Sequence, residues 1–412
     1  MVQKNKTLIE NFLSLGVLQI VSYTLPLINL PYLSRVLGVE KFGIVFFAFA
    51  FMQYFIMLTD YGFGLSATRE IAVNRHNKKN LSNIFSAVTF IKLFLLIVSF
   101  VILYLMILFI PKLQENWFVF MLSFLMVIGN AIYPVWFFQG MERMKYITFL
   151  NILAKLVFVL LVFIFVKKQE DYIIVPLFNS MGFLISGIIG MYFAIKNLGA
   201  KLYVPKMNSV KKQFKYSSEF FLSRVSVSAY TNTNSFCLGL IGSSIMVGYY
   251  VAAEKIYNAM NGVQIPLNQS LYPFVSKHKD IKTYKKWVLI ALICNFFICA
   301  FIFWFAKEFI TIFYGINMTE AYKILRIFCI VVLITFPSIL MGYPLLGALG
   351  YTKIANGSVI AGSIIHILGL FILFIIGKMN IYSIALMVLI TESTVFCVRA
   401  YFVWKYKLLK EI

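Results

Sequence analysis

Charged residues are scarce in this chain of 412 amino acids, where Asp, Glu, Lys and Arg together make up 13%. Soluble domains carry about 25% charged residues. Because 61% of the residues are hydrophobic and 17% are aromatic, so few charges could not cover the surface of a water-soluble globule. The composition excludes a soluble domain, a disordered chain, a collagen and a secreted disulfide scaffold, and it predicts an all-α polytopic membrane protein.

Residues that build active sites are also rare. The sequence has three His and five Cys, with no CxxC pair and no Cys/His cluster at the spacing of metal ligands. It holds no Ser/His/Asp set, no paired acidic motif and no glycine-rich loop that could cradle a phosphate. We therefore expect a protein that is not an enzyme and that needs neither metal nor cofactor.

Long apolar runs predict twelve transmembrane helices, because about 20 apolar residues cross the hydrocarbon core of a bilayer. Two of the runs contain charges: 146–166 carries Lys155, and 379–404 carries Glu392 and Arg399. The others are free of charge and cover residues 11–34, 42–59, 93–111, 116–141, 172–195, 225–253, 256–276, 287–306, 327–352 and 354–377. An even number of spans places both termini on the same side of the membrane.

Basic residues are concentrated in every second connection between these spans, for example in the lysine-rich segments 196–215 and 277–286. Cytoplasmic loops of membrane proteins carry such an excess of Lys and Arg. The pattern predicts cytoplasmic termini, and we expect the first span to remain as an uncleaved anchor. The net charge of +22 then reflects this asymmetry and attraction to anionic lipid, so no nucleic-acid partner is expected.

The segment 196–215 separates six predicted spans from the other six. This predicts an N-terminal six-helix lobe at 1–195, a cytoplasmic basic linker at 196–215 and a C-terminal six-helix lobe at 216–412. Parallel repeats are typical of two-lobed transporters, whose substrate path lies between the lobes. Chance similarity between apolar helices is the alternative to a repeat here, since the matches are short: Phe-Leu-Ser at 12–14 and 221–223, and Leu-Gly at 37–38 with Ile-Gly at 241–242.

Ionisable side chains at membrane depth cost roughly 2.5–3.5 kcal/mol each, so they usually face a cavity or a partner. The deep positive ones among them are Arg224, Lys255, Lys155 and Arg326. They predict a central cationic cavity that suits a phosphate-bearing anion, because guanidinium groups match phosphate oxygens. Intramolecular ion pairing is the alternative. Lys92, Arg399 and Asp60 lie near cytoplasmic helix ends, where we expect them to reach the headgroups.

The seventh span contains a run of six polar residues from Tyr230 to Ser235. A run of this length covers every face of a helix, so part of it must meet water, substrate or another helix. Amide and hydroxyl groups beside an aromatic ring suit a hydroxyl-rich ligand, which makes Tyr230, Asn232 and Asn234 candidate glycan contacts. The alternative is interhelical hydrogen bonding, which contributes about 0.6 kcal/mol per contact.

His366 and Glu392 fall at the middle of adjacent, antiparallel spans. A His and a carboxylate at the midplane form a candidate proton-coupling pair, because His titrates near neutral pH. A neutral His bonded to a neighbouring carbonyl is the alternative. Asp60 and Glu219 are further candidates for ion coupling or gating.

Several short motifs resemble those of the Wzx-type O-antigen flippases. In the first half they are YLSRVLG at 32–38, FG at 42–43, YGF at 61–63, ATREIA at 67–72 and WFFQGME at 136–142. The run FLSR at 221–224, followed by YTN at 230–232, is similar to the opening of the second half of that family. The similarity extends over most of the chain.

The resemblance implies the multidrug/oligosaccharidyl-lipid/polysaccharide transporter superfamily, with two six-helix lobes around a central cavity. It also implies ion-coupled alternating access that moves an undecaprenyl-diphosphate-linked repeat unit from the cytoplasmic to the periplasmic leaflet of a bacterial inner membrane. Arg224, within FLSR, then becomes the candidate diphosphate contact, while Arg35 and Arg69 are either substrate-binding, structural or gating residues. A glycan polymerase and a chain-length regulator are candidate partners of an expected monomer.

Two other functions remain open at this point. A drug or small-metabolite exporter of the same fold would be favoured by acids that dominate the cavity. A membrane glycan polymerase or ligase would need a large outer loop to hold its acceptor. The outer connections of this chain are short, which argues against the second of these.

Overall fold

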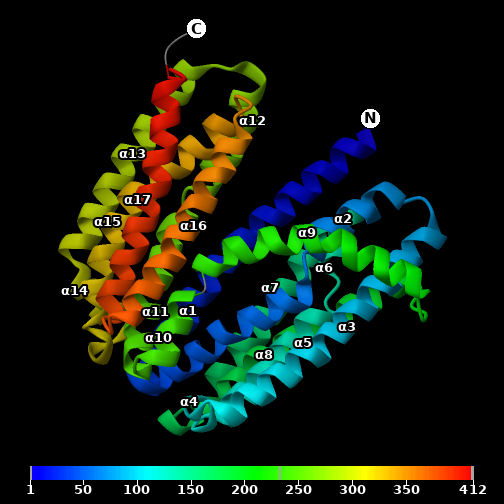
Figure 1. Cartoon of the computed structure of the whole chain (residues 1–412), viewed down its shortest axis with the longest axis horizontal. Helices are drawn as coiled ribbons and strands as arrows, with labels where there is room; N and C mark the ends of the chain where they lie inside the picture. The colour runs from blue at the N-terminus through cyan, green and yellow to red at the C-terminus, as the bar shows by residue number, and fades with distance from the viewer. Residues whose placement is uncertain (1, 232, 410–412) are drawn as a thin grey trace. The chain divides into compact units, whose positions relative to one another are not determined.

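The structure is a computed structural model that describes the backbone of residues 2–231 and 233–409. Within these ranges, the side chains of residues 2–24, 26–27 and 222–231 lie outside the description. All regular structure in the described residues is helical, and these residues contain no strand (Figure 1). The prediction of an all-α chain is confirmed.

The chain forms two compact units, Met1–Val225 and Ser226–Ile412. The helices of the first unit are α1 (Val2–Asp60), α2 (Phe63–Asn74), α3 (Lys78–Phe109), α4 (Pro111–Gln114), α5 (Trp117–Ile132), α6 (Val135–Gly140), α7 (Met144–Phe165), η1 (Gln169–Ile173), α8 (Val175–Tyr192), η2 (Phe193–Asn197) and most of α9 (Met207–Thr231). Those of the second are α10 (Thr233–Ile241), α11 (Ser244–Gly262), α12 (Ile265–His278), α13 (Ile281–Trp304), α14 (Ala306–Tyr314), η3 (Ile316–Met318), α15 (Ala321–Leu340), η4 (Met341–Gly347), α16 (Thr352–Ile375) and α17 (Ile381–Lys405).

Nine helical segments of the described residues are long and apolar enough to cross a membrane. They are Ile28–Asn74, Lys78–Phe109, Trp117–Gly140, Met144–Phe165, Gln169–Asn197, Ile281–Trp304, Ala321–Gly347, Thr352–Ile375 and Ile381–Lys405. The three remaining predicted spans correspond to the first part of α1, to α9 with α10, and to α11 with α12. The count agrees with twelve helices, six in each half.

Glycines end the first helix of each half. Inside α1 the backbone leaves the helical region at Gly38, whose φ of +69° is one that L side chains rarely adopt. In the second half the chain turns at Gly242, and the Ser243 hydroxyl then caps α11 by accepting from the Met246 N–H at 3.3 Å. The predicted span 225–253 is wrong, because hydropathy does not detect this turn of small residues inside an apolar run.

Close approach of α8 to α5 and α7 shapes the core of the first unit (Figure 1). A Cβ added at Gly187 would lie 2.6 Å from the carbonyl oxygen of Gly129 in α5. A Cβ added at Gly182 would collide with the carbonyl oxygen of Ala154 in α7. Small residues of this kind let helix backbones pack closely where no hydrophobic effect drives association.

We expect Gly182→Ala to destabilise the protein by about 1–3 kcal/mol, because the added methyl group must push α7 and α8 apart. Thermal unfolding in detergent measures the effect. Gly357→Ala is the matched control, since a Cβ at Gly357 in α16 meets no atom within 4 Å. Equal melting temperatures for the two variants would contradict the packing account.

The basic segment that precedes the seventh span is held on the first unit. The Ser86 hydroxyl donates to the carbonyl oxygen of Lys201 at 3.0 Å, and the hydroxyls of Ser66 and Ser217 are 2.7 Å apart. The Tyr61 ring stacks on Phe214 with 4.4 Å between centroids. The boundary between the two units follows Val225, within α9. The predicted lobe limits 1–195 and 216–412 stay a prediction.

In the second unit, α15 breaks where it passes into η4. Pro344 has no N–H, so it cannot give the carbonyl of Leu340 the bond that a regular α-helix would form, and the Tyr284 hydroxyl donates to this carbonyl at 3.0 Å. The Arg399 guanidinium donates to the carbonyl oxygen of Ser338 at 2.8 Å and to that of Ala355 at 3.3 Å. Arg399 is buried, so the expectation that it reaches the headgroups is wrong.

Candidate functional site

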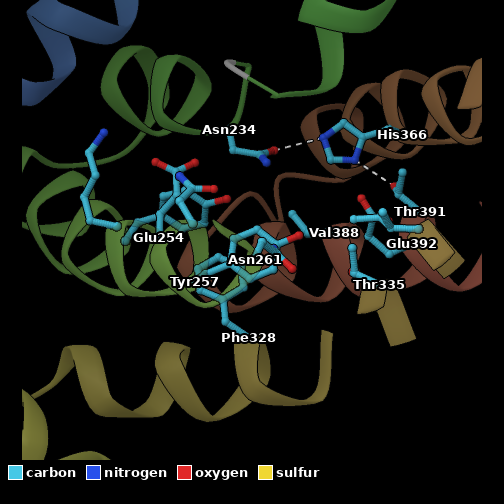
Figure 2. Close-up of a pocket in the computed structure, with 14 residues that line it drawn as sticks. Asn234, Glu254, Tyr257, Asn261, Phe328, Thr335, His366, Val388, Thr391 and Glu392 are labelled. Carbon is cyan, nitrogen blue, oxygen red and sulfur yellow. Dashed lines mark hydrogen bonds between the residues drawn. The ribbon is translucent and has the colours of Figure 1, made fainter. Parts of the chain in front are cut away.

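Helices α10, α11, α15, α16 and α17 of the second unit surround a cavity of about 350 Å³ (Figure 2). Amide, hydroxyl and carboxylate groups share its wall with aromatic rings. The lining residues are Asn234, Tyr250, Glu254, Lys255, Tyr257, Asn258, Asn261, Phe328, Thr335, Ile339, His366, Val388, Thr391 and Glu392.

The buried His366 side chain links three of these helices. Its Nδ1 lies 2.8 Å from the Thr391 hydroxyl of α17, and its Nε2 lies 3.0 Å from the Asn234 side-chain oxygen of α10 (Figure 2). The Thr391 hydroxyl also lies 2.8 Å from the carbonyl oxygen of Met387, to which it can donate. Tyr250 of α11 lines the same cavity and is fully buried. Side chains that are far apart in sequence thus form one polar network.

These distances suit a His366 ring that carries a proton on both nitrogens. In that state Nδ1–H donates to Thr391, Nε2–H donates to Asn234, and the Thr391 hydroxyl donates to Met387. A neutral ring fits as well. With its proton on Nδ1, that N–H donates to Thr391, the Thr391 hydroxyl donates to Met387, and Nε2 accepts from the Asn234 amide in its flipped orientation. Burial opposes charge on the ring, since a buried ion loses its hydration. The hydrogen-bond geometry therefore fits both the charged and the neutral ring.

Two carboxylates lie in the wall of the same cavity. Glu392 of α17 and Thr335 of α15 both line it. Glu254 of α11 has its Oε2 3.5 Å from the Ser235 hydroxyl and is next to Lys255. His366 and Glu392 both line this cavity, as expected for residues at the middle of adjacent spans. Their role in proton coupling stays a prediction.

The predicted cations lie in different places. Lys255 lines the cavity. Arg326 donates to the carbonyl oxygen of Phe303 at 3.1 Å and stacks on the ring of that residue, outside the cavity lining. Lys155 lies on α7 of the first unit, and Arg35 is exposed near the end of the first helix. The wall of this cavity therefore combines one of the predicted cations with two acids, and the cationic path between the lobes stays a prediction.

Three predicted site residues lie outside the description: Asn232 entirely, and Arg224 and Tyr230 in their side chains. The third candidate glycan contact, Asn234, is buried with its side chain bonded to His366. Interhelical bonding, the alternative for the polar run, is thus observed at Asn234. Contact with a glycan stays a prediction.

The gating candidates of the first unit lie on three helices: Asp60 at the end of α1, Arg69 in α2 and Glu219 in α9. Asp60 accepts from the buried Lys92 ammonium group at 3.1 Å, so the expectation that Lys92 reaches the headgroups is wrong. The same expectation for the partly exposed Asp60 stays a prediction. The Arg69 guanidinium donates to the Tyr216 hydroxyl at 3.3 Å, whereas Glu219 is exposed on α9. The first two contacts are structural links within the unit, and a gating role stays a prediction.

Sequence reasoning missed most of the wall that α11 supplies. Tyr250, Glu254, Tyr257, Asn258 and Asn261 follow one another at steps of three, four, and one residue, which places them on one helical face. The predicted spans 225–253 and 256–276 divided this helix at its middle and so hid the pattern. Had the helix been predicted to begin just after Gly242, the spacing of these polar residues would have shown that they share one face.

Among the described residues, no group of three His, Cys, Asp or Glu side chains could hold a metal ion.

Residues 8–279, more than half of the chain, match the family described as polysaccharide biosynthesis protein. A protein of Escherichia coli (strain K12), provisionally named O-antigen transporter, is 34% identical over 281 residues, which cover 68% of each chain. A protein of Shigella dysenteriae with the same name is 28% identical over 363 residues, 87% of this chain and 91% of that one. Both names describe transporters, in agreement with the prediction of a protein that is not an enzyme.

Two solved structures share the fold. Lipid II flippase MurJ, in an inward closed conformation, aligns with a TM-score of 0.72 over 97% of this chain and 89% of that chain, at 15% identity. A multidrug resistance MATE family transporter of the MOP superfamily, in an inward-facing conformation, aligns with a TM-score of 0.68 over 93% of this chain and 94% of that chain, also at 15% identity. The predicted transporter fold is confirmed, although identities this low speak for the fold alone. The chain is a multi-pass membrane protein of the polysaccharide biosynthesis family.

Proposed function

We propose that this protein is a flippase that moves an undecaprenyl-diphosphate-linked oligosaccharide from the cytoplasmic to the periplasmic leaflet of a bacterial inner membrane. The observation that carries the proposal is the family match over residues 8–279 together with two relatives named as O-antigen transporters. The likeness in fold to a lipid II flippase supports it.

The lipid-linked substrate has two chemical parts, a diphosphate and a glycan. Arg224 is our candidate for the diphosphate, because a guanidinium group donates two parallel hydrogen bonds to phosphate oxygens. Lys155 and Arg35 are further candidate cations on the substrate path. Tyr230 and Asn232 are our candidates for the glycan, whose hydroxyl groups suit amide and phenol partners. Alternating access would expose these groups to each side of the membrane in turn.

The polar cavity of the second unit is our candidate for the ion-coupling site. His366 sits in a hydrogen-bond network that suits either of its protonation states, and Glu254 and Glu392 can exchange protons with water in the same cavity. The network joins α10, α16 and α17, so a change in the charge of His366 alters the bonds that hold these helices together. Proton binding would thereby favour one conformation of the transporter.

One observation favours a second function, export of a small cationic molecule. Glu254 and Glu392 give the cavity more acids than bases among the described lining residues, counting His366 as neutral. Acids of this kind bind organic cations. Increased sensitivity to cationic drugs in cells that lack the protein, with normal surface polysaccharide, would support export in place of flipping.

The test of the flippase proposal is a deletion in the bacterium that encodes the chain. We expect lipid-linked repeat units to accumulate on the cytoplasmic leaflet, where a glycan-specific lectin reaches them only in inside-out vesicles. Surface polysaccharide should be lost in parallel. Unchanged surface polysaccharide and no lipid-linked accumulation would contradict the proposal.

We also propose that both termini are cytoplasmic, that the protein works as a monomer in the lipid bilayer, and that a glycan polymerase and a chain-length regulator are its partners. The orientation rests on the excess of Lys and Arg in every second connection. A C-terminal fluorescent-protein fusion should therefore fluoresce, whereas a C-terminal alkaline phosphatase fusion should be inactive. An active phosphatase fusion would reverse the proposed topology.

A further inference from the structure

A second cavity in the second unit has almost wholly apolar walls and encloses about 300 Å³. One face of α13 forms one wall of this cavity, and the broken helix formed by α15 and η4 forms the opposite wall. The apolar lining residues that matter here are Val288, Leu289, Leu292, Pro337, Met341 and Leu345. A cavity with such walls excludes a glycan or a diphosphate, because their polar groups would be left without partners.

The walls of this cavity are held in place by the break in α15. Tyr284 lines the cavity while its hydroxyl donates to the carbonyl oxygen of Leu340, which cannot form an α-helical bond with Pro344. Met341 and Leu345 lie on the π-helical segment η4, beyond the same break. The cavity is therefore a consequence of the irregular backbone and of the bond that compensates for it.

A cation lies in the lining of this apolar space. Lys285 lines the cavity and is partly exposed, one helical turn from Leu289. Leu289 is 60% exposed and the neighbouring Trp287 is 51% exposed, so the cavity borders the lipid-facing side of α13. Lipid can therefore reach it from the bilayer. An apolar space with a Lys side chain at its edge is complementary to a fatty acyl chain whose headgroup is anionic.

We propose that this cavity binds one acyl chain of an anionic phospholipid, with the lipid phosphate against Lys285. A bilayer phospholipid fits better than the lipid-linked substrate, because the substrate headgroup must leave its leaflet in each cycle, whereas Lys285 is fixed on α13. The proposal does not depend on which molecule the protein transports.

The bound lipid would act on the polar cavity through one shared helix. Thr335 and Ile339 line the polar cavity, whereas Pro337 and Met341 line the apolar cavity, so α15 and η4 separate the two. An acyl chain packed against Pro337 and Met341 favours the bent form of this helix. Anionic phospholipid would thereby bias the conformation of the wall that carries Thr335 and Ile339.

The test uses the full-length protein in nanodiscs of equimolar phosphatidylcholine and phosphatidylglycerol, with retained lipids counted by native mass spectrometry. Lys285→Gln should lower the retained phosphatidylglycerol-to-phosphatidylcholine ratio about five-fold, the effect of one Lys near an anionic headgroup. Lys286→Gln is the matched control, because Lys286 is exposed and outside the cavity lining. Leu289→Trp should fill the cavity and displace the lipid, whereas Ile290→Trp, at an exposed neighbour, should leave it bound.

Each outcome decides the proposal. Loss of phosphatidylglycerol in Lys285→Gln and Leu289→Trp, with retention in both controls, supports it. Equal ratios in all four variants would overturn it, and so would retention of phosphatidylcholine as strong as that of phosphatidylglycerol. Displacement of phosphatidylglycerol by added undecaprenyl diphosphate would overturn it as well, because the cavity would then belong to the substrate tail. None of these results bears on whether the protein flips a lipid-linked glycan, which the deletion tests separately.

Discussion

Replacing His366 with Gln will reduce proton-driven transport by about 10- to 100-fold and will flatten its dependence on pH. Gln can bond with both Thr391 and Asn234, as the ring does, but it cannot bind a proton in this pH range. A loss of this size corresponds to a coupling free energy of roughly 1–3 kcal/mol between proton and substrate. The measurement is substrate flipping in proteoliposomes with and without an imposed proton gradient.

The control for His366→Gln is His278→Gln. His278 is exposed at the end of α12, away from the cavity, so its loss should leave transport and its pH dependence unchanged. Glu392→Gln removes a carboxylate from the wall of the same cavity and should reduce the response to the gradient as well. If His366→Gln transports at the original rate with the original pH profile, the cavity is not the coupling site.

Replacing Arg399 with Met will destabilise the second unit by about 2–5 kcal/mol. The buried guanidinium donates to Ser338 and Ala355 carbonyls and, at 2.9 Å, to the Ser358 hydroxyl. Removing it leaves two buried carbonyl oxygens without this donor, and each loss costs about 1–3 kcal/mol. It also removes the side chain that packs on Gly342, where a Cβ would lie 2.9 Å from Nη1. Denaturant unfolding in detergent micelles measures the change.

Arg326→Met is the matched comparison, because Arg326 is half-buried and donates to the single carbonyl of Phe303 while stacking on two rings. Its loss should cost about 1 kcal/mol, in the range of one hydrogen bond. A cost for Arg399→Met no greater than that for Arg326→Met would contradict the structural role assigned to Arg399.

The helical class and the number of spans are predictable from the sequence because the bilayer imposes a length on every apolar run. The run 225–253 shows where this reasoning fails. Hydropathy averages over the turn at Gly242 and Ser243, whereas the repeat match had marked Gly242 as the counterpart of Gly38. Backbone conformation at a glycine carries information that composition alone does not.

The site is less predictable because its parts come from distant segments. His366 and Glu392 stand out as rare ionisable residues in apolar spans, and the structure places both in one cavity. Arg399 and Lys92 stand out equally, yet they are buried against partners far away in the sequence: Ser338 for Arg399 and Asp60 for Lys92. A sequence identifies a costly charge, but only the packing of helices shows what compensates for it.

The central claim is that this chain moves a lipid-linked glycan by recognising its diphosphate, and flipping in proteoliposomes tests it most directly. A fluorescent undecaprenyl-diphosphate oligosaccharide is placed in both leaflets, and dithionite then quenches the outer label. We predict that the protein makes the inner pool accessible and that Arg224→Ala reduces the rate by at least about 10-fold, as expected for the loss of a charge-assisted bidentate contact. Flipping that proceeds equally with Arg224→Ala, or no flipping by the intact protein under a proton gradient, would contradict the account.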